Sequence, residues 1–471
     1  MQPSLGRYAP IGIWGAAALC ATLWPLPADA AGRDGAVPGL SWAIPFLGLL
    51  LSIAILPLAA PRFWHHRMGA VAGFWTLALL APQAALAGLG SAAGLAWHAV
   101  LLEYLPFVTL LLALFVAGGG IVIEGGPWGT PAGNTALLAL GTLLAGVLGT
   151  TGVAMVLIHP LLRANAHRRR RAHLVVFFIL LCANIGGATS PLGDPPLYLG
   201  FLRGVPFFWP ARHLGPLMLA VAAPLLLAFW LTDRHFAARE PAAPPRAPLR
   251  LRGWMNVGLV GVVLGCVLVQ GAWHPGAVRV LGAGIALERL AGMAVFLAVA
   301  VASLWGTPRR LREANLFAWA PMAEVGILFA ALFVTIDPLM AMLAAGPGGP
   351  VAAPLALLAD GQGAPRPLAY FWTTGLASAL LDNAPTYLVF FRAAGDDAAR
   401  LAGAWHQVLE AIAGGAVLFG GLTYIGNAPN LLVRAIAAHR GIRMPGFFGY
   451  IAWAAALLLP ALGLASLVFF S

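Results

Sequence analysis

Long apolar runs dominate the chain and predict membrane-spanning helices. A helix needs about 20 apolar residues to cross the hydrocarbon core of a bilayer. Runs of this length recur along the sequence, and most charged residues fall between them. The uninterrupted runs expected to span the membrane lie at 39–60, 69–92, 95–122, 213–232, 254–273, 286–306, 316–343 and 446–470.

Four further apolar segments carry internal breaks. Segments 172–200 and 406–433 are interrupted by Gly and Pro, which predicts helices broken within the membrane. Segments 134–162 and 367–395 have a turn-like break at their centre, and we interpret them as re-entrant hairpins. The whole pattern predicts an all-α polytopic membrane protein with about 10–11 transmembrane helices, two re-entrant hairpins and two broken helices.

Composition excludes several classes of protein. Hydrophobic residues make up 61% of the 471 residues and charged residues 9%, whereas about 25% of an ordinary soluble domain is charged. A soluble enzyme is therefore excluded. The net charge of +11 does not indicate a nucleic-acid partner, because the basic residues lie between apolar runs. The expected environment is a lipid bilayer.

The basic residues, all of them Arg, predict the orientation of the chain. Most of the 27 fall on one side of the membrane only if both hairpins enter and leave by the same face. The positive-inside rule makes that side the cytoplasm and puts 396–405 outside. We attribute the Arg runs to orientation and to contact with anionic lipids. They lie at 7, 62–67, 163–171, 234–252, 309–312 and 434–443.

The chain divides into two halves joined by a linker, after an N-terminal segment with two interpretations. The boundaries are 1–31 for a signal peptide or a first transmembrane helix, 39–232 for the first half with hairpin 134–162 and broken helix 172–200, 233–253 for a cytoplasmic linker, and 254–470 for the second half with hairpin 367–395 and broken helix 406–433.

The two halves form an inverted repeat. With one gap, Gly-Gly, Thr, Gly, Asp or Asn, and Pro recur in both breaks at a separation near 234 residues, the distance from Thr189 to Thr423. The charge pattern brings the first hairpin in from the cytoplasm and the second from outside. Inverted repeats with broken helices at matched positions are typical of secondary transporters.

Acidic residues at the breaks are the main candidates for function. Asp194 lies in the first broken helix and Asp382 at the tip of the second hairpin. A carboxylate inside the bilayer is costly, and it marks a functional position by default. We predict that each binds either a proton or a share of a cation. The alternative is that each only caps a half-helix.

Oxygen atoms around these acids suit a hard cation such as sodium. Half-helix ends and freed backbone carbonyls coordinate ions in such transporters. Sodium itself is expected at Asp194, Asp382, Asn383 and Asn427. Glu103 and Glu324, at matched positions in the halves, are candidates for a proton relay or for a structural pair. The predicted ion-binding residues are Asp194, Asp382, Asn383, Thr189, Ser190, Gly193, Thr423, Gly426, Asn427, Thr150 and Thr151.

Several motifs resemble the ion transporter superfamily. The likeness covers roughly 39–470 and is greatest to bacterial sodium:proton antiporters, whose relatives are also labelled citrate transporters. It implies a scaffold and a moving transport unit that contains both hairpins and both broken helices. The resemblance also implies the inner membrane of a bacterium as the location. The dicarboxylate branch has Ser-Asn-Thr at its hairpin tips, which this chain lacks. The motifs are Gly-Thr-Thr-Gly at 149–152, Pro-Leu-Leu-Arg-Ala-Asn at 160–165, the stretch 184–196, and Tyr-Ile-Gly-Asn-Ala-Pro-Asn at 424–430 through Met444-Pro445.

We therefore predict a secondary active transporter and no enzyme, specifically a sodium:proton antiporter working by alternating access. The alternative is a sodium-coupled citrate or dicarboxylate transporter, for which Arg203 and Arg392 are the cations that flank the breaks. A remote alternative is an intramembrane aspartyl protease with Asp194 and Asp382 as its dyad, although Pro191 stands where that motif requires Gly. The expected partners are small ions or a small carboxylate, with no nucleic acid and no cofactor beyond sodium ions and protons; a homodimer is left open.

Overall fold

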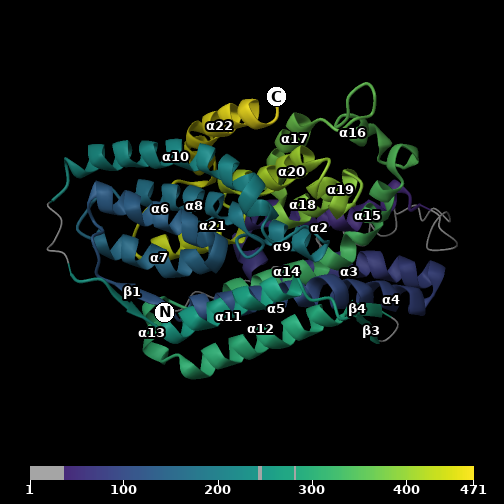
Figure 1. Ribbon diagram of the computed structural model, residues 1–471, viewed down its shortest axis with the longest axis horizontal. Coiled ribbons are helices and arrows are strands. Elements are labelled where there is room, and N and C mark those ends of the chain that lie inside the picture. Colours follow the sequence, from purple (N-terminus) through teal and green to yellow (C-terminus); the bar gives the residue numbers. More distant parts are fainter. Residues whose placement is uncertain (1–36, 242–246, 281–282) are drawn as a thin grey trace, which may run out of the picture.

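A computed structural model describes residues 37–471 except 242–246 and 281–282. The predicted signal peptide or first helix at 1–31 lies outside the described residues. Helices build most of the described chain, in agreement with the predicted all-α class, and they form two layers (Figure 1).

One layer, here called the hairpin layer, contains both hairpins, both broken helices and the two long helices that pack on them. The first hairpin is α6–α7, and its broken helix runs α8–η3–α9. The second hairpin is α17–α18, and its broken helix runs α20–η5–α21. The bounds are α6 (Pro131–Leu148), α7 (Thr150–Ala164), α8 (Ala172–Leu181), η3 (Ile185–Thr189), α9 (Pro195–Leu202), α10 (Trp209–Ala237), α17 (Pro367–Leu381), α18 (Asn383–Ala393), α19 (Ala398–Ala402), α20 (His406–Leu418), η5 (Phe419–Leu422), α21 (Ala428–His439) and α22 (Phe447–Phe469).

The other layer, here called the flanking layer, contains the remaining long helices. It includes a π-helical turn, η2, between α4 and α5. The bounds are η1 (Leu40–Ala43), α2 (Ile44–Ala59), α3 (Pro61–Ala87), α4 (Leu89–Ala99), η2 (Val100–Tyr104), α5 (Leu105–Gly118), α11 (Trp254–Gln270), α12 (Leu287–Gly306), α13 (Arg309–Ala314), α14 (Ala320–Thr335) and α15 (Asp337–Ala344); η4 (Gly346–Gly348) and α16 (Ala352–Ala356) then lead back to α17.

Eight helical segments of the described chain are long and apolar enough to cross a membrane, or nine if the bent pair α14–α15 is one span. The eight include α6, which the sequence assigns to a hairpin. Helix α11, in the run 254–273 that was expected to span, is a shorter apolar helix, and so is the α20–η5 part of the second broken helix. The chain is therefore a multi-pass membrane protein.

The two hairpins enter the hairpin layer from opposite ends of the molecule. The loops that contain 163–171, 234–239, 250–252 and 309–312 gather at one end, here called the Arg-rich end, on the left in Figure 1. Helices α6 and α7 extend inward from this end, and α17 and α18 extend inward from the opposite end. Helices α9 and α21 lie between them.

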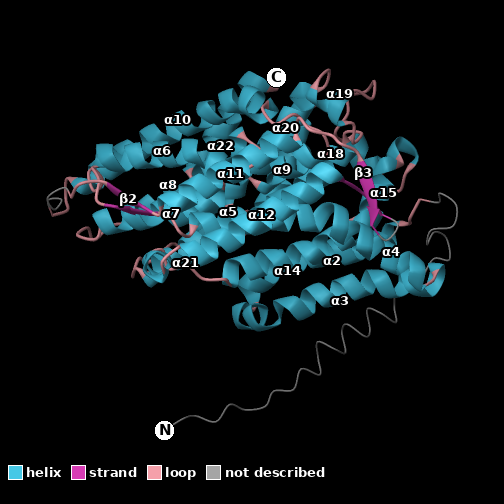
Figure 2. Ribbon diagram, turned by 60° about the horizontal axis from the view of Figure 1, so that its bottom comes forward, coloured by secondary structure: helices cyan, strands magenta, loops and turns pink. Residues whose placement is uncertain are grey.

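Two short β-ribbons, which the sequence does not predict, lie at opposite ends of the molecule (Figure 2). Strand β1 (Val122–Glu124) pairs with β2 (Arg250–Arg252), and β3 (Ala277–Val280) pairs with β4 (Ala283–Ala286), both antiparallel. Strands this short carry little periodicity. The first ribbon fixes the end of the linker 233–253 to the segment that follows α5.

A buried polar network holds the base of the first hairpin. The Asp233 carboxylate forms an ion pair with Arg168, lies 2.9 Å from His173 Nε2, and accepts a hydrogen bond of 2.9 Å from Asn134 Nδ2. Arg168 also donates to the carbonyl of Gly129 at 2.6 Å. The sequence attributes the whole Arg run to orientation and lipid contact. The lipid contact is wrong for Arg168, which is only 4% exposed; the role of the run in orientation stays a prediction.

Candidate functional site

Four half-helices begin at the centre of the hairpin layer. Helix α7 begins at Thr150 and α18 at Asn383, while Asp194 and Asn427 are the N-cap residues of α9 and α21. Prolines early in α9 and α21 favour a helix start there, because a first-turn N–H needs no partner within the helix. Each half-helix therefore presents its N-terminus to one place.

The Asp194 carboxylate joins all four half-helices. Its Oδ1 accepts hydrogen bonds from Thr150 Oγ1 and Asn427 Nδ2, each at 3.1 Å, and its Oδ2 accepts one from Asn383 Nδ2. Asp194 is buried, with only 2% of the residue exposed. The other amide atom of Asn383, Oδ1, is buried and has no hydrogen-bond partner in the described chain. The structure thus brings four predicted site residues into direct contact.

Asp382 occupies the tip of the second hairpin in a conformation that favours glycine. Its φ of 79° and ψ of 149° nearly repeat the values at Gly149, 74° and 155°, on the first tip. The Asp382 side chain accepts a hydrogen bond of 2.6 Å from the backbone N–H of Asn383. A residue other than Gly persists in this region only where surrounding structure compensates for the strain.

We expect Asp382→Gly to be more stable than Asp382→Ala by about 1 kcal/mol, because only Gly adopts this backbone conformation without strain. Both variants lose the carboxylate and its contact with the Asn383 N–H, so the comparison isolates the backbone. Thermal unfolding of both purified proteins in the same detergent measures the difference. An alanine variant at least as stable as the glycine variant would mean that the tip is not strained.

The two breaks correspond residue by residue, in a register that differs from the one the sequence suggests. Ser190 Oγ donates to the carbonyl of Gly146 on the first hairpin. Thr423 Oγ1 donates to the carbonyl of Ala379 on the second at 2.6 Å. Ser190, and not Thr189, is therefore the counterpart of Thr423, and the repeat needs no gap. The separation is 233 residues, as between Asp194 and Asn427.

The predicted glycines allow close backbone contact in each break. A Cβ on Gly193 would lie 2.2 Å from the carbonyl oxygen of Gly187. A Cβ on Gly426 would lie 2.7 Å from the carbonyl oxygen of Gly420. Both approaches are shorter than real Cβ contacts, so a side chain at either position would force the break apart.

Two neighbouring cavities lie against the tips. The smaller, about 60 Å³, is lined by Asp194, Thr150 and Thr151. The larger, about 250 Å³, is lined by Asp382 and Glu324. Asn427, which donates to Asp194, also lines the larger cavity. Both cavities share a wall made of the first turns of α14 and α21, with the side chains of Pro321, Val325, Ala428 and Leu432.

Three predicted residues at the breaks contact the hairpin arms, and a fourth, Glu103, lies outside the site. The hydroxyls of Ser190 and Thr423 hold the breaks to the hairpin arms, and Thr189 packs against α6, where a Cβ on Gly146 would lie 2.1 Å from its Oγ1. Glu103 does not reach the site.

Glu103 belongs to an ion-pair cluster at the end opposite the Arg-rich end. It lies 3.2 Å from Arg203, whose Nε lies 3.7 Å from Asp396. Arg392 also pairs with Asp396. Glu324, the sequence counterpart of Glu103, lies instead beside Asp382 and accepts a hydrogen bond from Trp64 Nε1 at 3.4 Å. Neither Arg203 nor Arg392 lines either cavity.

Asn184 and Asn430 link the two broken helices, a role that the sequence does not reveal. Asn184 Nδ2 donates to Asn430 Oδ1 at 2.8 Å, and Asn427 Nδ2 lies 3.3 Å from Asn184 Oδ1. Both residues are fully buried. They belong to motifs that resemble the ion transporter superfamily, and that membership is the one signal that could have identified them.

Comparison with known proteins identifies the family of the chain. The family described as "Putative citrate transport" matches residues 36–470, nearly the whole chain. The chain belongs to this family. No curated protein matches it. Membership in the family supports membrane transport as the role of this multi-pass protein.

Proposed function

We propose that this member of the family is a sodium:proton antiporter of the bacterial inner membrane, working by alternating access. Its Arg-rich end would face the cytoplasm. Asp194 and Asp382 would carry the exchanged charge. The ions alone would serve as its partners, and a homodimer stays a prediction.

The observation that carries this proposal is the environment of the Asp194 carboxylate. It is buried and accepts hydrogen bonds only from neutral amides and a hydroxyl. A buried carboxylate must be neutralised by a counter-charge or by a proton. Asp233 has that counter-charge in Arg168. In the described chain, neither cavity at the site has a basic lining residue, so a bound cation or a proton would neutralise Asp194.

Exchange follows because the two occupants exclude each other. A protonated Asp194 is neutral and no longer attracts a cation, whereas the ionised form attracts sodium. The unpartnered Oδ1 of Asn383 supplies a further oxygen ligand. Sodium binding would release the proton on one side of the membrane, and protonation would release sodium on the other side.

The position of the tips supports alternating access. The wall that both cavities share begins with the first turn of α14, and Trp64 in the larger cavity lies in the first turn of α3. Both helices begin next to an Arg cluster, so the site lies toward the Arg-rich end of the flanking layer. Movement of the hairpin layer toward the opposite end would expose the site to the other side.

Citrate is the second candidate substrate, and two observations favour it. The four half-helix N-termini carry partial positive charge toward the centre, where it attracts carboxylates. The cavity of about 250 Å³ beside Asp382 has room for a small organic acid. Bound sodium would then offset the repulsion between citrate and Asp382.

The test uses proteoliposomes that contain the parental protein and a pH-sensitive dye. We expect sodium or lithium, and not potassium, to drive proton movement that protein-free liposomes lack. Uptake of labelled citrate is measured in the same preparation. Citrate uptake without any sodium-driven pH change would replace the antiport proposal by the citrate alternative on the same fold.

A further inference from the structure

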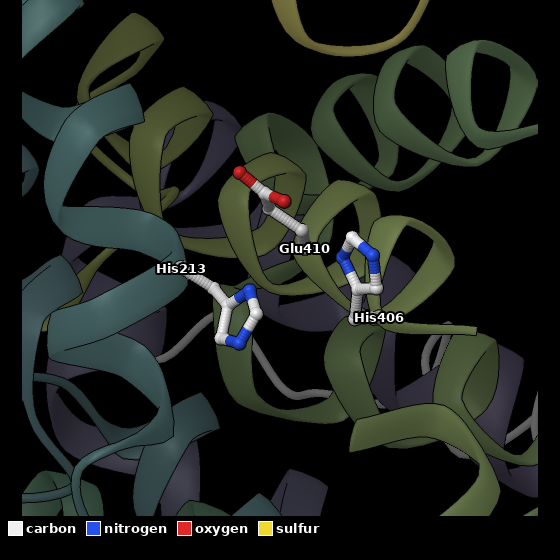
Figure 3. A group of neighbouring side chains, drawn as sticks. All are labelled: His213, His406 and Glu410. Carbon is white, nitrogen blue, oxygen red and sulfur yellow. The ribbon is translucent and has the colours of Figure 1, made fainter. Parts of the chain in front are cut away.

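A cluster of two imidazoles and a carboxylate lies away from the central site (Figure 3). His213 comes from the second turn of α10, and His406 and Glu410 come from the first turns of α20. One potential ligand atom from each residue lies within 4.8 Å of the other two. Both helices begin at the end opposite the Arg-rich end. None of the three residues lines either cavity of the central site.

Glu410 lacks the partners that a buried carboxylate needs. It is 7% exposed, and in the described chain it forms no ion pair and no hydrogen bond through its side chain. Asp233 and Asp194, the other acids buried to this degree, each accept several hydrogen bonds. The Glu410 oxygens are not among the fully buried unpartnered atoms of the described chain, so a metal ion could reach them and would supply charge and coordination.

The packing of α10 and α20 brings the side chains of His213, His406 and Glu410 together. His406 and Glu410 are four residues apart on α20, so their side chains share one face of the helix. The ring of His213 lies 5.3 Å from that of His406, centroid to centroid, and is stacked on Trp209 at 4.7 Å. His406 is exposed and His213 partly exposed, so an ion can reach the buried carboxylate from solvent.

We propose that His213, His406 and Glu410 bind one divalent transition-metal ion, with Zn²⁺ as the best fit to the donor set. Two imidazole nitrogens and a carboxylate oxygen are common Zn²⁺ ligands, and a water would take the fourth position. Bonds of about 2.0–2.2 Å require the ligand atoms to approach each other to about 3.5 Å. Rotation of the exposed His406 side chain provides that adjustment.

The ion would join the two repeats within one layer. Helix α10 belongs to the first repeat and α20 to the second, and they pack against each other. Since both belong to the hairpin layer, the ion would stabilise that layer as a unit without bridging it to the flanking layer. The site is independent of the proposed exchange of sodium and protons.

The test uses the full chain, purified in detergent with a tag that contains no histidine and stripped with a chelator. Calorimetric titration with Zn²⁺ alone is expected to give one tight equivalent, and Zn²⁺ is expected to raise Tm by about 2–4 °C. His406→Ala and Glu410→Gln should each weaken binding by at least about tenfold and remove the Tm shift. Because His406 is exposed, its removal leaves folding intact.

His274→Ala is the matched control. His274 forms an exposed pair with Glu288, whose carboxylate lies 3.2 Å from the ring, without a third ligand. This variant should bind Zn²⁺ as the parental protein does. Unchanged affinity in His406→Ala, or loss of binding in His274→Ala, would overturn the proposal. Co²⁺ gives a second readout, since its visible absorption should report a nitrogen- and oxygen-ligated site that His213→Ala removes.

Discussion

Asp194→Asn is expected to reduce sodium-driven proton movement to the level of protein-free liposomes. The substitution preserves the shape of the side chain and removes the group that exchanges a proton for a cation. The hydrogen bonds can survive, because the Asn383 amide can rotate and offer its unpartnered Oδ1 to the new amide. The variant should therefore fold, insert and fail to exchange. Dye dequenching at matched protein density measures the effect.

Two further variants make this result specific. Asp382→Asn should also abolish exchange, because it removes the carboxylate from the larger cavity. Asp337→Asn should exchange at the parental rate, since Asp337 is exposed at the start of α15 and lines neither cavity. If Asp194→Asn and Asp382→Asn both exchange at the parental rate, the carboxylate mechanism is wrong.

Asp233→Ala is expected to destabilise the protein by about 3–5 kcal/mol. The substitution leaves the buried guanidinium of Arg168 without its counter-charge and removes the acceptor of His173 and Asn134. Breaking one side of a buried ion pair costs more than the pair contributes, because the remaining charge stays in a poorly solvated place. Thermal unfolding in detergent should give a Tm lower by about 10 °C.

Glu240→Ala is the control for this prediction. Glu240 accepts hydrogen bonds from the backbone N–H groups of Arg169 and Arg170, beside the same Arg run, but it is exposed. Its loss should therefore cost less than about 1 kcal/mol. Equal destabilisation by the two substitutions would show that the charge of the Arg run matters and the buried pair does not.

The broken architecture was predictable because its signals are local. Gly, Pro and acidic residues in apolar runs mark the breaks at 172–200 and 406–433, and the Arg distribution separates the hairpins from full spans. The repeat also groups Asp194 with Asn383, 189 residues away, although it does not predict which of their atoms are in contact. Other pairings across the fold were not predictable, because no periodicity or repeat connects His213 with His406 or Arg168 with Asp233.

The position of Glu103 follows from the inversion itself. Glu103 and Glu324 occupy similar sequence contexts, so the sequence groups them as one relay. An inverted repeat, however, runs its equivalent helices in opposite directions through the membrane. Glu324 lies near the start of α14, toward the Arg-rich end, whereas Glu103 meets Arg203 toward the other end. Resemblance between the halves therefore predicts opposite depths for these two acids.

The register of the repeat shows a different limit. Thr189 and Ser190 both carry hydroxyls, so a residue comparison with Thr423 has no means to choose between them. The choice depends on which hydroxyl reaches a carbonyl of the hairpin arm, which is a property of the folded backbone. A gap inserted to align the two threonines conceals an uninterrupted correspondence.

The ribbon of β1 and β2 would limit how far the layers move past each other in the proposed transport cycle. Three connections cross between the layers: 119–130, 238–253 and 345–366. The ribbon pairs the first of these connections, as far as Glu124, with the second just before α11, and residues 125–130 then join the ribbon to α6. A fully extended segment of six residues reaches about 20 Å. Under the proposed alternating access, this short connection, and not the depth of the membrane, would determine how far the hairpin layer can move.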